Sequence, residues 1–372
     1  MTYQKNSGAV KRFGKLMRFA TWLQNLPSKM TPPPFRLMQI STSFWQSRVL
    51  YVAARLDIAT VLGDTQSSAD EIAAQVSAQP DAIFRLLRML AAMGIFEELS
   101  PRIFRNNKLS RPLRSDAHDS IRAMILMHNS PEMSRPWFEQ LENGVREGEV
   151  PFKLAHGEEL FDYMDTHPEF DALFSGAMDS VEALFGDSFA RDFDWGRFER
   201  IIDVGGSRGS KAATILKQHP GLRALITDRP QVIEEAEDWW LKQGDPVLRE
   251  RMSFEACNLI ESVPQANSGR DIYLLSAILH GFDDETSIRV LSNLAAATKG
   301  TGACIALMEF VLPELGADLS ASSFDMQMFM GTRGRERTLD EWQNLSARSG
   351  LQLEEIVDLQ SFAKILVLLP EE

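Results

Sequence analysis

From residue 199 onward, short apolar segments alternate with longer amphipathic ones, and this alternation constrains the fold of the chain most strongly. The first pair is RIIDVG, which begins at residue 200, followed by SKAATILKQHP, which begins at residue 210. Further apolar segments are RALITD, MSFEAC, DIYLLSAIL and CIALMEFVL, and the chain closes with the pair LEEIVDL and FAKILVLLP. Strands that alternate with helices predict an α/β fold with a Rossmann-like, doubly wound, mostly parallel sheet. In such a sheet the ligand site lies at the carboxyl ends of the strands.

The turn after the first strand of this region, GGSRG, contains Gly205, Gly206 and Gly209. Glycine allows a ligand to approach the backbone closely, and the following helix offers free N–H groups. The spacing G-G-x-x-G is neither the dinucleotide fingerprint nor a P-loop, so it does not require a pyrophosphate ligand. The next strand ends in Asp228, whose carboxylate can accept hydrogen bonds from the two hydroxyls of a ribose, or can simply cap the helix that follows. Together these features favour a nucleoside without phosphates, and S-adenosylmethionine fits that description.

Residues 67–110 have the pattern of two helices followed by a β-hairpin. Ser67 or Ser68 can cap a first helix that runs to Val76, and a second helix is predicted from Ile83 to Met93. This is the order of a winged-helix unit, which often binds DNA. The second helix, AIFRLLRMLAAM, offers few polar groups that could contact base edges, and the net charge of −13 also argues against a nucleic-acid partner. We therefore expect a packing and dimerisation module.

The first part of the chain is basic, since no Asp or Glu occurs before Asp57. The segment VKRFGKLMRFATWLQNL combines basic residues with apolar residues at helical spacing, and the prolines of TPPPF end it. One interpretation is an organelle presequence or a membrane-surface helix. The interpretation that we prefer is an arm whose apolar stripe packs on a partner subunit. Residues 35–63 are also predicted to be helical and to end at Gly63.

The 372 residues are enough for more than one domain. We predict an arm and winged-helix-like dimerisation domain at 1–120, a helical connection that lines a substrate pocket at 121–190, and a Rossmann-like cofactor-binding domain at 191–372. The two cysteines, Cys257 and Cys304, cannot form a disulfide framework, so a reducing, cytoplasmic setting is expected. No run of 18 apolar residues occurs, which predicts no membrane span. The six histidines show no paired ligand spacing, so no metal site is expected.

Several motifs taken together resemble the class I S-adenosylmethionine-dependent O-methyltransferases of the caffeate, flavonoid and antibiotic-tailoring type. The resemblance covers nearly the whole chain. Besides the winged-helix region and IIDVGGSRG, it includes AHGEELFDYMDTHPEF, ITDRPQVIEEA, LLSAILHGFDDE, MEFVLPE and FDMQMFMGTRGRERTLDEW. It implies S-adenosylmethionine as cofactor, a small secondary metabolite as methyl acceptor, and a homodimer formed through the N-terminal domain.

Methyl transfer to a hydroxyl requires a base that removes the proton, and histidine suits this task near neutral pH. The resemblance implies that His280 is this base and that Glu309 and Glu336 hold it. It also assigns the cofactor site to residues at the carboxyl edge of the sheet, namely Asp203, Gly205, Gly206, Asp228, Asn258, Leu259 and Ser276. For the acceptor pocket we expect His128, Met178, Phe324, Met328 and Phe329, although the methionine and phenylalanine residues could equally belong to an ordinary core.

The sequence departs from the family pattern at four places. Ser207 replaces the usual third glycine of the turn, and Asn258 replaces an acid near the adenine. Ser276 stands where relatives often have Lys or Arg, and Gly281 and Phe282 follow His280 in place of an acid and a Trp. These changes leave two alternatives open: transfer to carbon or nitrogen, and a cofactor-bound cyclase, lyase or decarboxylase on the same fold. A non-catalytic winged-helix regulator of DNA is the third alternative.

Overall fold

The computed structural model describes residues 2–371, including all side chains except those of residues 25, 28, 179 and 181–185. The chain separates into two compact units, which are described here one at a time. A sheet unit comprises residues 1–18, 148–150 and 185–372, and a helical unit comprises residues 19–147 and 151–184. The division at residues 120 and 190 that the sequence suggests stays a prediction.

The helical unit begins with short helices and a small antiparallel sheet. Its first elements are α2 (Pro33–Ser41), α3 (Ser43–Arg55), α4 (Ile58–Leu62), β1 (Gln66–Ser68), α5 (Ala69–Gln75), α6 (Pro80–Ala92), β2 (Phe96–Ser100), β3 (Ile103–Asn106) and η1 (Arg111–Leu113). Further helices follow: α7 (Arg122–His128), α8 (Pro131–Arg135), η2 (Pro136–Gln140), α9 (Leu141–Glu147), α10 (Pro151–His156), α11 (Leu160–Thr166) and α12 (Pro168–Phe185).

The winged-helix arrangement expected from the sequence is present in this unit. Helices α5 and α6 precede the hairpin β2–β3, and β1 joins it to give the strand order β1-β3-β2. Ser68 caps α5, because its hydroxyl accepts a hydrogen bond from the N–H of Glu71 while the Glu71 side chain accepts one from the N–H of Ser68. Buried residues such as Ile72, Leu87 and Phe104 join the helices to the sheet in one apolar core.

The predicted helical stretch 35–63 is divided into three helices, α2, α3 and α4. The break before α4 lies at Asp57, which has a left-handed backbone with φ of 53°. Its carboxylate accepts hydrogen bonds from the hydroxyls of Thr60 (2.6 Å) and Ser115 (2.7 Å), and these bonds hold the bend in place. The prolines of TPPPF follow the end of the first helix, α1 (Ser7–Met30), as expected, and Pro33 in addition opens α2 at its first position.

The sheet unit contains eight strands and the helices between them. In order these are α13 (Ser188–Asp192), η3 (Trp195–Arg197), β4 (Arg200–Val204), α14 (Ser210–Gln218), β5 (Arg223–Asp228), α15 (Pro230–Gln243), α16 (Pro246–Arg249), β6 (Met252–Ala256), β7 (Asp271–Ser276), η4 (Leu279–Gly281), α17 (Asp284–Thr298), β8 (Cys304–Leu312), α18 (Leu319–Gly331), β9 (Arg337–Thr338), α19 (Leu339–Arg348), β10 (Leu351–Asp358) and β11 (Ala363–Pro370). The strand order is β10-β11-β8-β7-β4-β5-β6, with β9 paired to β8.

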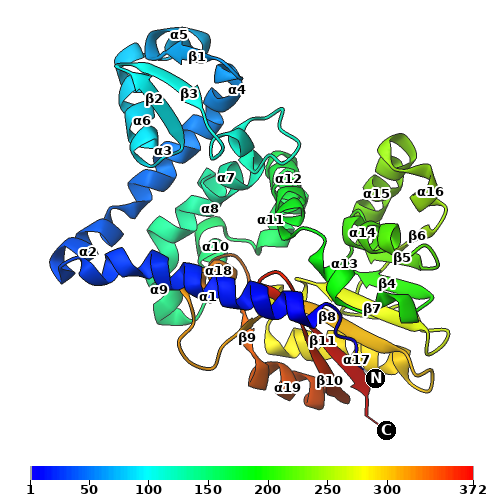
Figure 1. Ribbon diagram of the computed structural model, residues 1–372. Helices are drawn as coiled ribbons and strands as arrows, with labels where there is room; N and C mark the ends of the chain where they lie inside the picture. Colours follow the sequence, from blue (N-terminus) through cyan, green and yellow to red (C-terminus); the bar gives the residue numbers. More distant parts are fainter. Residues whose placement is uncertain (1, 372) are drawn as a thin grey trace. The chain divides into compact units, whose positions relative to one another are not determined.

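The predicted doubly wound, mostly parallel sheet is confirmed. Strands β4 to β8 pair in parallel, and the antiparallel strand β11 joins β8 to β10. Figure 1 shows α13 and α14 on one side of the sheet and α17 and α19 on the other. Successive residues of a strand point to opposite faces of the sheet. Ile201 and Ile272 pack with α13 and α14, whereas Ile202 and Tyr273 pack with α17 and α19.

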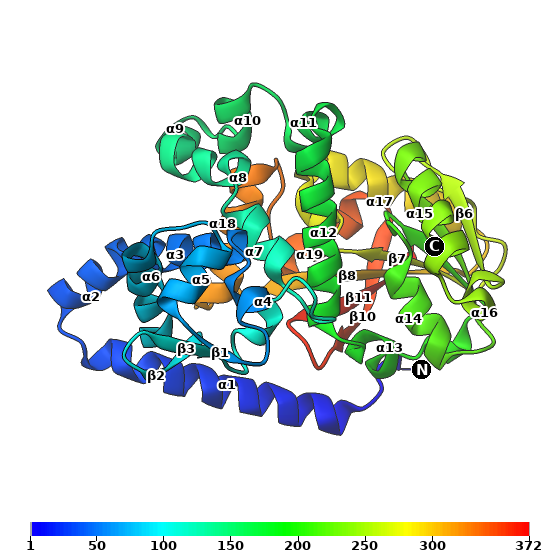
Figure 2. The ribbon, with the colours of Figure 1, turned by 90° about the horizontal axis from the view of Figure 1, so that it is seen from above.

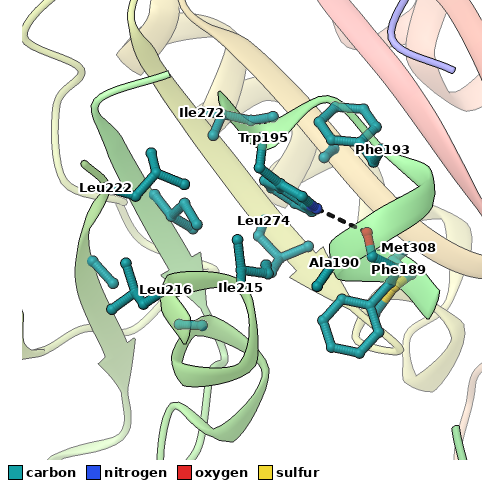
Figure 3. Close-up of a cluster of buried hydrophobic side chains, with 14 of the residues drawn as sticks. Phe189, Ala190, Phe193, Trp195, Ile215, Leu216, Leu222, Ile272, Leu274 and Met308 are labelled. Carbon is teal, nitrogen blue, oxygen red and sulfur yellow. Dashed lines mark hydrogen bonds between the residues drawn. The ribbon is translucent and has the colours of Figure 1, made fainter. Parts of the chain in front are cut away.

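Trp195 lies at the centre of the first of these faces. Its ring packs among side chains from α13, α14 and β7, and its Nε1 donates a 2.8 Å hydrogen bond to the carbonyl oxygen of Phe189 (Figure 3). The indole is fully buried, so this bond satisfies a polar group that would otherwise be costly to bury. This core therefore packs the face of the sheet that carries α13 and α14, opposite the face that packs against α17.

The N-terminal arm forms one long helix, α1 (Ser7–Met30), which Figure 2 shows as a continuous ribbon. Just before it, Tyr3 is 8% exposed and belongs to the core of the sheet unit. Beyond residue 20 every side chain of α1 that is described is exposed. None of the helices within residues 2–371 has both the length and the apolar character that a membrane crossing requires.

Candidate active site

The glycine turn between β4 and α14 is held by backbone contacts. The N–H groups of Gly205 and Gly206 both donate to the carbonyl oxygen of Thr227, at 2.8 and 3.1 Å. Gly205 has φ of 72°, and a Cβ atom on it would lie 2.6 Å from the Ile278 side chain. A Cβ atom on Gly206 would lie 2.7 Å from the Asp203 carboxyl carbon. Packing thus requires both glycines, and their N–H groups are used within the sheet, as the lack of a phosphate motif suggested.

Asp228 lies at the carboxyl end of β5, beside this turn. Its Oδ2 accepts a 2.9 Å hydrogen bond from the N–H of Ser207, and its Oδ1 accepts a 2.8 Å bond from the N–H of Arg229. Each carboxylate oxygen keeps a second lone pair, so the group can still accept hydrogen bonds from two hydroxyls. Ser207, which replaces the third glycine, holds its place in a left-handed conformation with φ of 51°.

The remaining predicted cofactor residues follow the ends of β6 and β7. Cys257, directly after β6, donates its N–H to the carbonyl oxygen of Asp228 at 2.8 Å, which places Asn258 close to the end of β5. The Asn258 side chain accepts a 3.2 Å bond from the N–H of Ile260 and so shapes its own turn. Leu259 packs on the core. Ser276 ends β7, opposite Met308 of β8. All these residues therefore lie along one edge of the sheet.

His280 lies in η4, the turn that follows β7. Its Nδ1 is 2.7 Å from Oε1 of Glu336, and its side chain is 12% exposed. Since the carboxylate can only accept, Nδ1 carries the hydrogen and Nε2 of the neutral ring keeps a lone pair. Burial alone would lower the pKa of His280. The hydrogen bond to Glu336 and the charges of Glu309 and Glu336 outweigh burial and raise this pKa above its ordinary value.

Glu309, on β8, binds the backbone of the same turn. It is 1% exposed, and its Oε1 accepts hydrogen bonds from the N–H groups of Ile278 (3.1 Å) and Leu279 (3.0 Å). Its Oε2 has no hydrogen-bond partner within residues 2–371. Burial, followed by the charge of Glu336, raises the pKa of Glu309 to about 7, against the lowering effect of His280 and the two backbone bonds. The structure thus brings the three predicted catalytic residues together.

The predicted acceptor-pocket residues divide between the two units. Phe324, on α18, lies near His280 with ring centroids 5.9 Å apart, and it also contacts Phe310 at 5.1 Å. Met328 lies one helical turn beyond Phe324 on α18, and Phe329 is rotated away from this face. His128 ends α7, where it is exposed, and Met178 is a residue of α12. These two belong to the helical unit, so their place in the pocket stays a prediction.

Three residues near His280 were not predicted. Arg337 is 1% exposed and contacts the turn that carries His280. Asp325 accepts a 2.9 Å hydrogen bond from the N–H of Glu336. A Cβ atom on Gly334 would lie 1.9 Å from the carbonyl oxygen of His280, so the two backbones touch. The sequence contained one signal for them, the motif GTRGRERT around Glu336, but not the contacts themselves.

A glycine turn, a carboxylate at the second strand and a buried His–Glu pair at one sheet edge define an enzyme that binds a nucleoside cofactor. Comparison with known proteins makes this class specific. Residues 138–352 match the O-methyltransferase domain, and residues 38–116 match the O-methyltransferase dimerisation domain. The chain therefore belongs to the O-methyltransferase family, and the resemblance noted in the sequence is confirmed.

The relatives include enzymes that methylate different atoms. The chain is 32% identical over 330 residues to the phenazine O-methyltransferase of Lysobacter antibioticus, which covers 89% of this chain and 94% of the relative. It is 31% identical over 331 residues to the phenazine-1-carboxylate N-methyltransferase of Pseudomonas aeruginosa, which covers 89% of this chain and 96% of the relative. The chain is thus a methyltransferase, and the family alone does not fix the atom that accepts the methyl group.

The solved structures of related proteins identify the cofactor. CalO1, a methyltransferase in calicheamicin biosynthesis, was solved in a SAH-bound form, and it matches with a TM-score of 0.78 at 28% identity, covering 91% of this chain and 98% of that one. S-adenosylmethionine is the cofactor of this enzyme, as predicted. The site fits it: Gly206 leaves no room for a side chain beside Asp203, Asp228 offers acceptors for a ribose, and the N–H groups of the glycine turn are not left for phosphates.

Proposed function

We propose that the enzyme transfers a methyl group to a phenol or enol hydroxyl of a small secondary metabolite, with His280 as general base. The observation that carries this proposal is the 2.7 Å bond between His280 Nδ1 and Glu336, because it leaves Nε2 as a proton acceptor. Phe324 beside the imidazole supports an aromatic acceptor. The relatives' names, which include phenazine O-methyltransferase and 3-amino-4-hydroxybenzoate 4-O-methyltransferase, point to acceptors of the same kind.

In this mechanism the protein's work is to hold the acceptor and remove its proton. Bound S-adenosylmethionine supplies an electrophilic methyl group on a sulfonium. Gly205, Gly206 and Asp228 would hold it at the sheet edge, with Asp203, Asn258, Leu259 and Ser276 around it. His280 Nε2 takes the hydroxyl proton, and the imidazolium that results is stabilised by the carboxylate of Glu336. Glu309 fixes the turn through its two backbone hydrogen bonds, so the base keeps its direction.

The acceptor atom can be identified directly. Purified enzyme would be incubated with methyl-deuterated S-adenosylmethionine and with aromatic hydroxyl and amino compounds, along with a metabolite extract of the host, and products would be read by mass spectrometry. A labelled methyl ether supports the proposal. A label on nitrogen or carbon would move the enzyme to the other branches of its family. An unlabelled product that still requires the cofactor would indicate a cyclase, lyase or decarboxylase, an alternative motivated by Gly281 and Phe282 after His280.

The assembly we propose is a homodimer formed through the N-terminal domain, which includes the arm. The dimerisation-domain match supports it, and so does the exposed apolar surface of α1, α2 and α3. That surface consists of Leu16, Phe19, Trp22, Leu23, Leu26, Met30, Phe35, Leu37, Met38, Ile40, Phe44 and Trp45. Residues 1–56 carry nine basic and no acidic side chains, so the rest of a chain with net charge −13 stands at −22. A second copy therefore offers both apolar surface and opposite charge to this arm.

A further inference from the structure

The segment after α18 reaches the turn of His280 through main-chain contact as well as through Glu336. Gly334 touches the His280 carbonyl, and its hypothetical Cβ would also lie 2.5 Å from the carbonyl carbon of Gly281. Its N–H is held by the hydroxyl of Thr332 at 3.0 Å. This close approach brings the next residues, including Arg337, against the turn.

Arg337 binds the turn on both sides of His280. Its Nη1 donates a 3.0 Å hydrogen bond to the carbonyl oxygen of Leu279, and its Nη2 donates a 2.8 Å bond to that of Phe282. Asp284, at the start of α17, holds the same guanidinium through Nε (3.1 Å) and Nη2 (2.8 Å). The guanidinium carbon also lies 5.2 Å from the centre of the Trp342 ring. A planar group with five donors can make these contacts together, whereas a lysine ammonium cannot.

We propose that Arg337 is a positioning residue, which fixes the turn between β7 and α17 so that His280 stays on Glu336 and faces the acceptor. This inference rests on the proposed role of His280 as the base. The chemistry explains why a charged residue is buried here: the carbonyls of Leu279 and Phe282 need donors, and Asp284 compensates the charge. An apolar residue of similar size would take the Arg337 donors from both carbonyls and leave that of Leu279 with only the longer bonds from the Phe282 N–H (3.2 Å) and the Ser287 hydroxyl (3.5 Å).

Arg337 also acts on the electrostatics of the base. The charged groups that act on His280 are Glu309 on β8, Glu336 just before β9, and Arg337 on β9. Asp284 on α17 binds Arg337, and Asp325 on α18 binds the N–H of Glu336. The positive charge of Arg337 lowers the pKa of His280, against the two glutamates. Removal of this charge alone would therefore raise the pKa of His280, whereas a weaker bond to Glu336 would lower it. Because only the neutral imidazole accepts a proton, the acid limb of the kcat/KM profile moves with this pKa.

The test uses two variants of Arg337 and a matched control. R337K keeps the charge but not the planar set of donors, whereas R337M removes both. Arg335, two residues earlier, is half exposed and pairs with Glu341, so R335M controls for the loss of an arginine in this segment. For each protein we would measure the Kd of S-adenosylmethionine by calorimetry, kcat/KM against pH, and the His280 pKa by NMR, with the signal assigned by its absence in H280N.

We expect kcat/KM to fall about 10- to 100-fold in R337K, because a small displacement of a catalytic group has an effect of this size. Cofactor Kd should stay within about twofold. R337K keeps the charge, so the NMR pKa of His280 should fall in this variant as the bond to Glu336 weakens. R337M, which also loses the charge, should show a higher His280 pKa than R337K, while R335M should match the wild type in all three measurements. If R337K folds with the wild-type kcat/KM or with an unchanged His280 pKa, Arg337 does not position the base.

A milder variant covers the case in which R337K or R337M does not fold. Asp284 is half exposed, and D284N weakens the hold on Arg337 without creating a buried vacancy. We expect kcat/KM of D284N to fall at least threefold relative to R335M at unchanged cofactor Kd, and an unchanged value would overturn the proposal. The NMR pKa does not depend on turnover. An active H280A would therefore refute the base assignment, while the pKa shift in R337K would still test whether Arg337 holds His280 on Glu336.

Discussion

Replacing Glu309 with glutamine tests whether a buried carboxyl group near His280 keeps its proton close to neutral pH. Glutamine has the same shape, and its oxygen can still accept the N–H groups of Ile278 and Leu279, which Glu309 holds at 3.1 and 3.0 Å. The substitution removes the ionisation and little else. Any change in the pH dependence of stability can then be assigned to the ionisation of Glu309 and to its effect on the pKa of His280.

The sign and size follow from the raised pKa of Glu309, about 7 instead of 4.5. Below pH 4.5 the group is protonated in both the folded and the unfolded chain. Between pH 4.5 and 7 the unfolded chain loses the proton first, so the free energy of unfolding falls as pH rises through this window. The difference between the folded and unfolded pKa values of Glu309 corresponds to about 3 kcal/mol of the free energy of unfolding. His280 also has a raised pKa and contributes with the same sign, and because the charge of Glu309 is one cause of that rise, E309Q reduces this contribution as well.

The assay is urea unfolding at pH 5 and pH 8, followed by tryptophan fluorescence, for the wild type, E309Q and the control E354Q. Glu354 is an exposed residue of β10. Between these pH values the wild type and E354Q should lose about 2.5 kcal/mol more than E309Q, since the unfolded carboxyl group is already partly ionised at pH 5. At pH 8 E309Q should be the more stable protein. Equal pH dependence of wild type and E309Q would show that Glu309 ionises normally, and the electrostatic description of the site would be wrong.

Three further predictions concern the cofactor turn and the assembly. D228A should weaken binding of S-adenosylmethionine about 10- to 150-fold, because a hydrogen bond to a charged group contributes roughly 1.5–3 kcal/mol. The affinity of D228N should lie between those of D228A and the wild type, and an unchanged calorimetric Kd in D228A would remove Asp228 from the ribose site. S207G should stabilise the protein by up to about 1 kcal/mol in urea unfolding. A non-glycine residue in the left-handed conformation costs roughly 1–2 kcal/mol, and the greater entropy of glycine in the unfolded chain offsets part of the gain from removing this strain. Clear destabilisation of S207G would contradict the strain argument. Sedimentation at micromolar protein should give twice the monomer mass, and W22E should lower it; a monomeric wild type that instead binds anionic vesicles would favour the membrane-surface interpretation of the arm.

Much of the fold was predictable because the signals were local. The alternation of strands and helices after residue 199 predicted the sheet, and the pair Ser67 and Ser68 predicted the capped start of α5, where Ser68 is the cap. The division of residues 35–63 was missed, since it depends on the bend at Asp57, whose carboxylate is held by the distant Ser115. Helix α18 was also missed, because its apolar and polar residues follow no clear stripe along SASSFDMQMFMG.

The candidate site shows the same limit. Sequence patterns indicated His280, Glu309 and Glu336, and the structure brings them together. They did not distinguish the two glutamates, of which one bonds the imidazole and the other the backbone of the turn. They also gave no sign that Arg337 is buried, because charged residues are normally exposed and its partners lie 50 or more residues away in sequence. Long-range contacts of this kind require the fold.

The measurement that tests the central claim most directly compares wild type and H280A once an acceptor is identified. Methyl transfer from deuterated S-adenosylmethionine would be followed by mass spectrometry, and cofactor binding by calorimetry on the same preparations. We predict that H280A binds the cofactor with wild-type Kd and loses methyl transfer by about 10²- to 10⁴-fold, the usual contribution of a general base. Turnover close to wild type in H280A would contradict the account, because the proton would then leave the acceptor without His280.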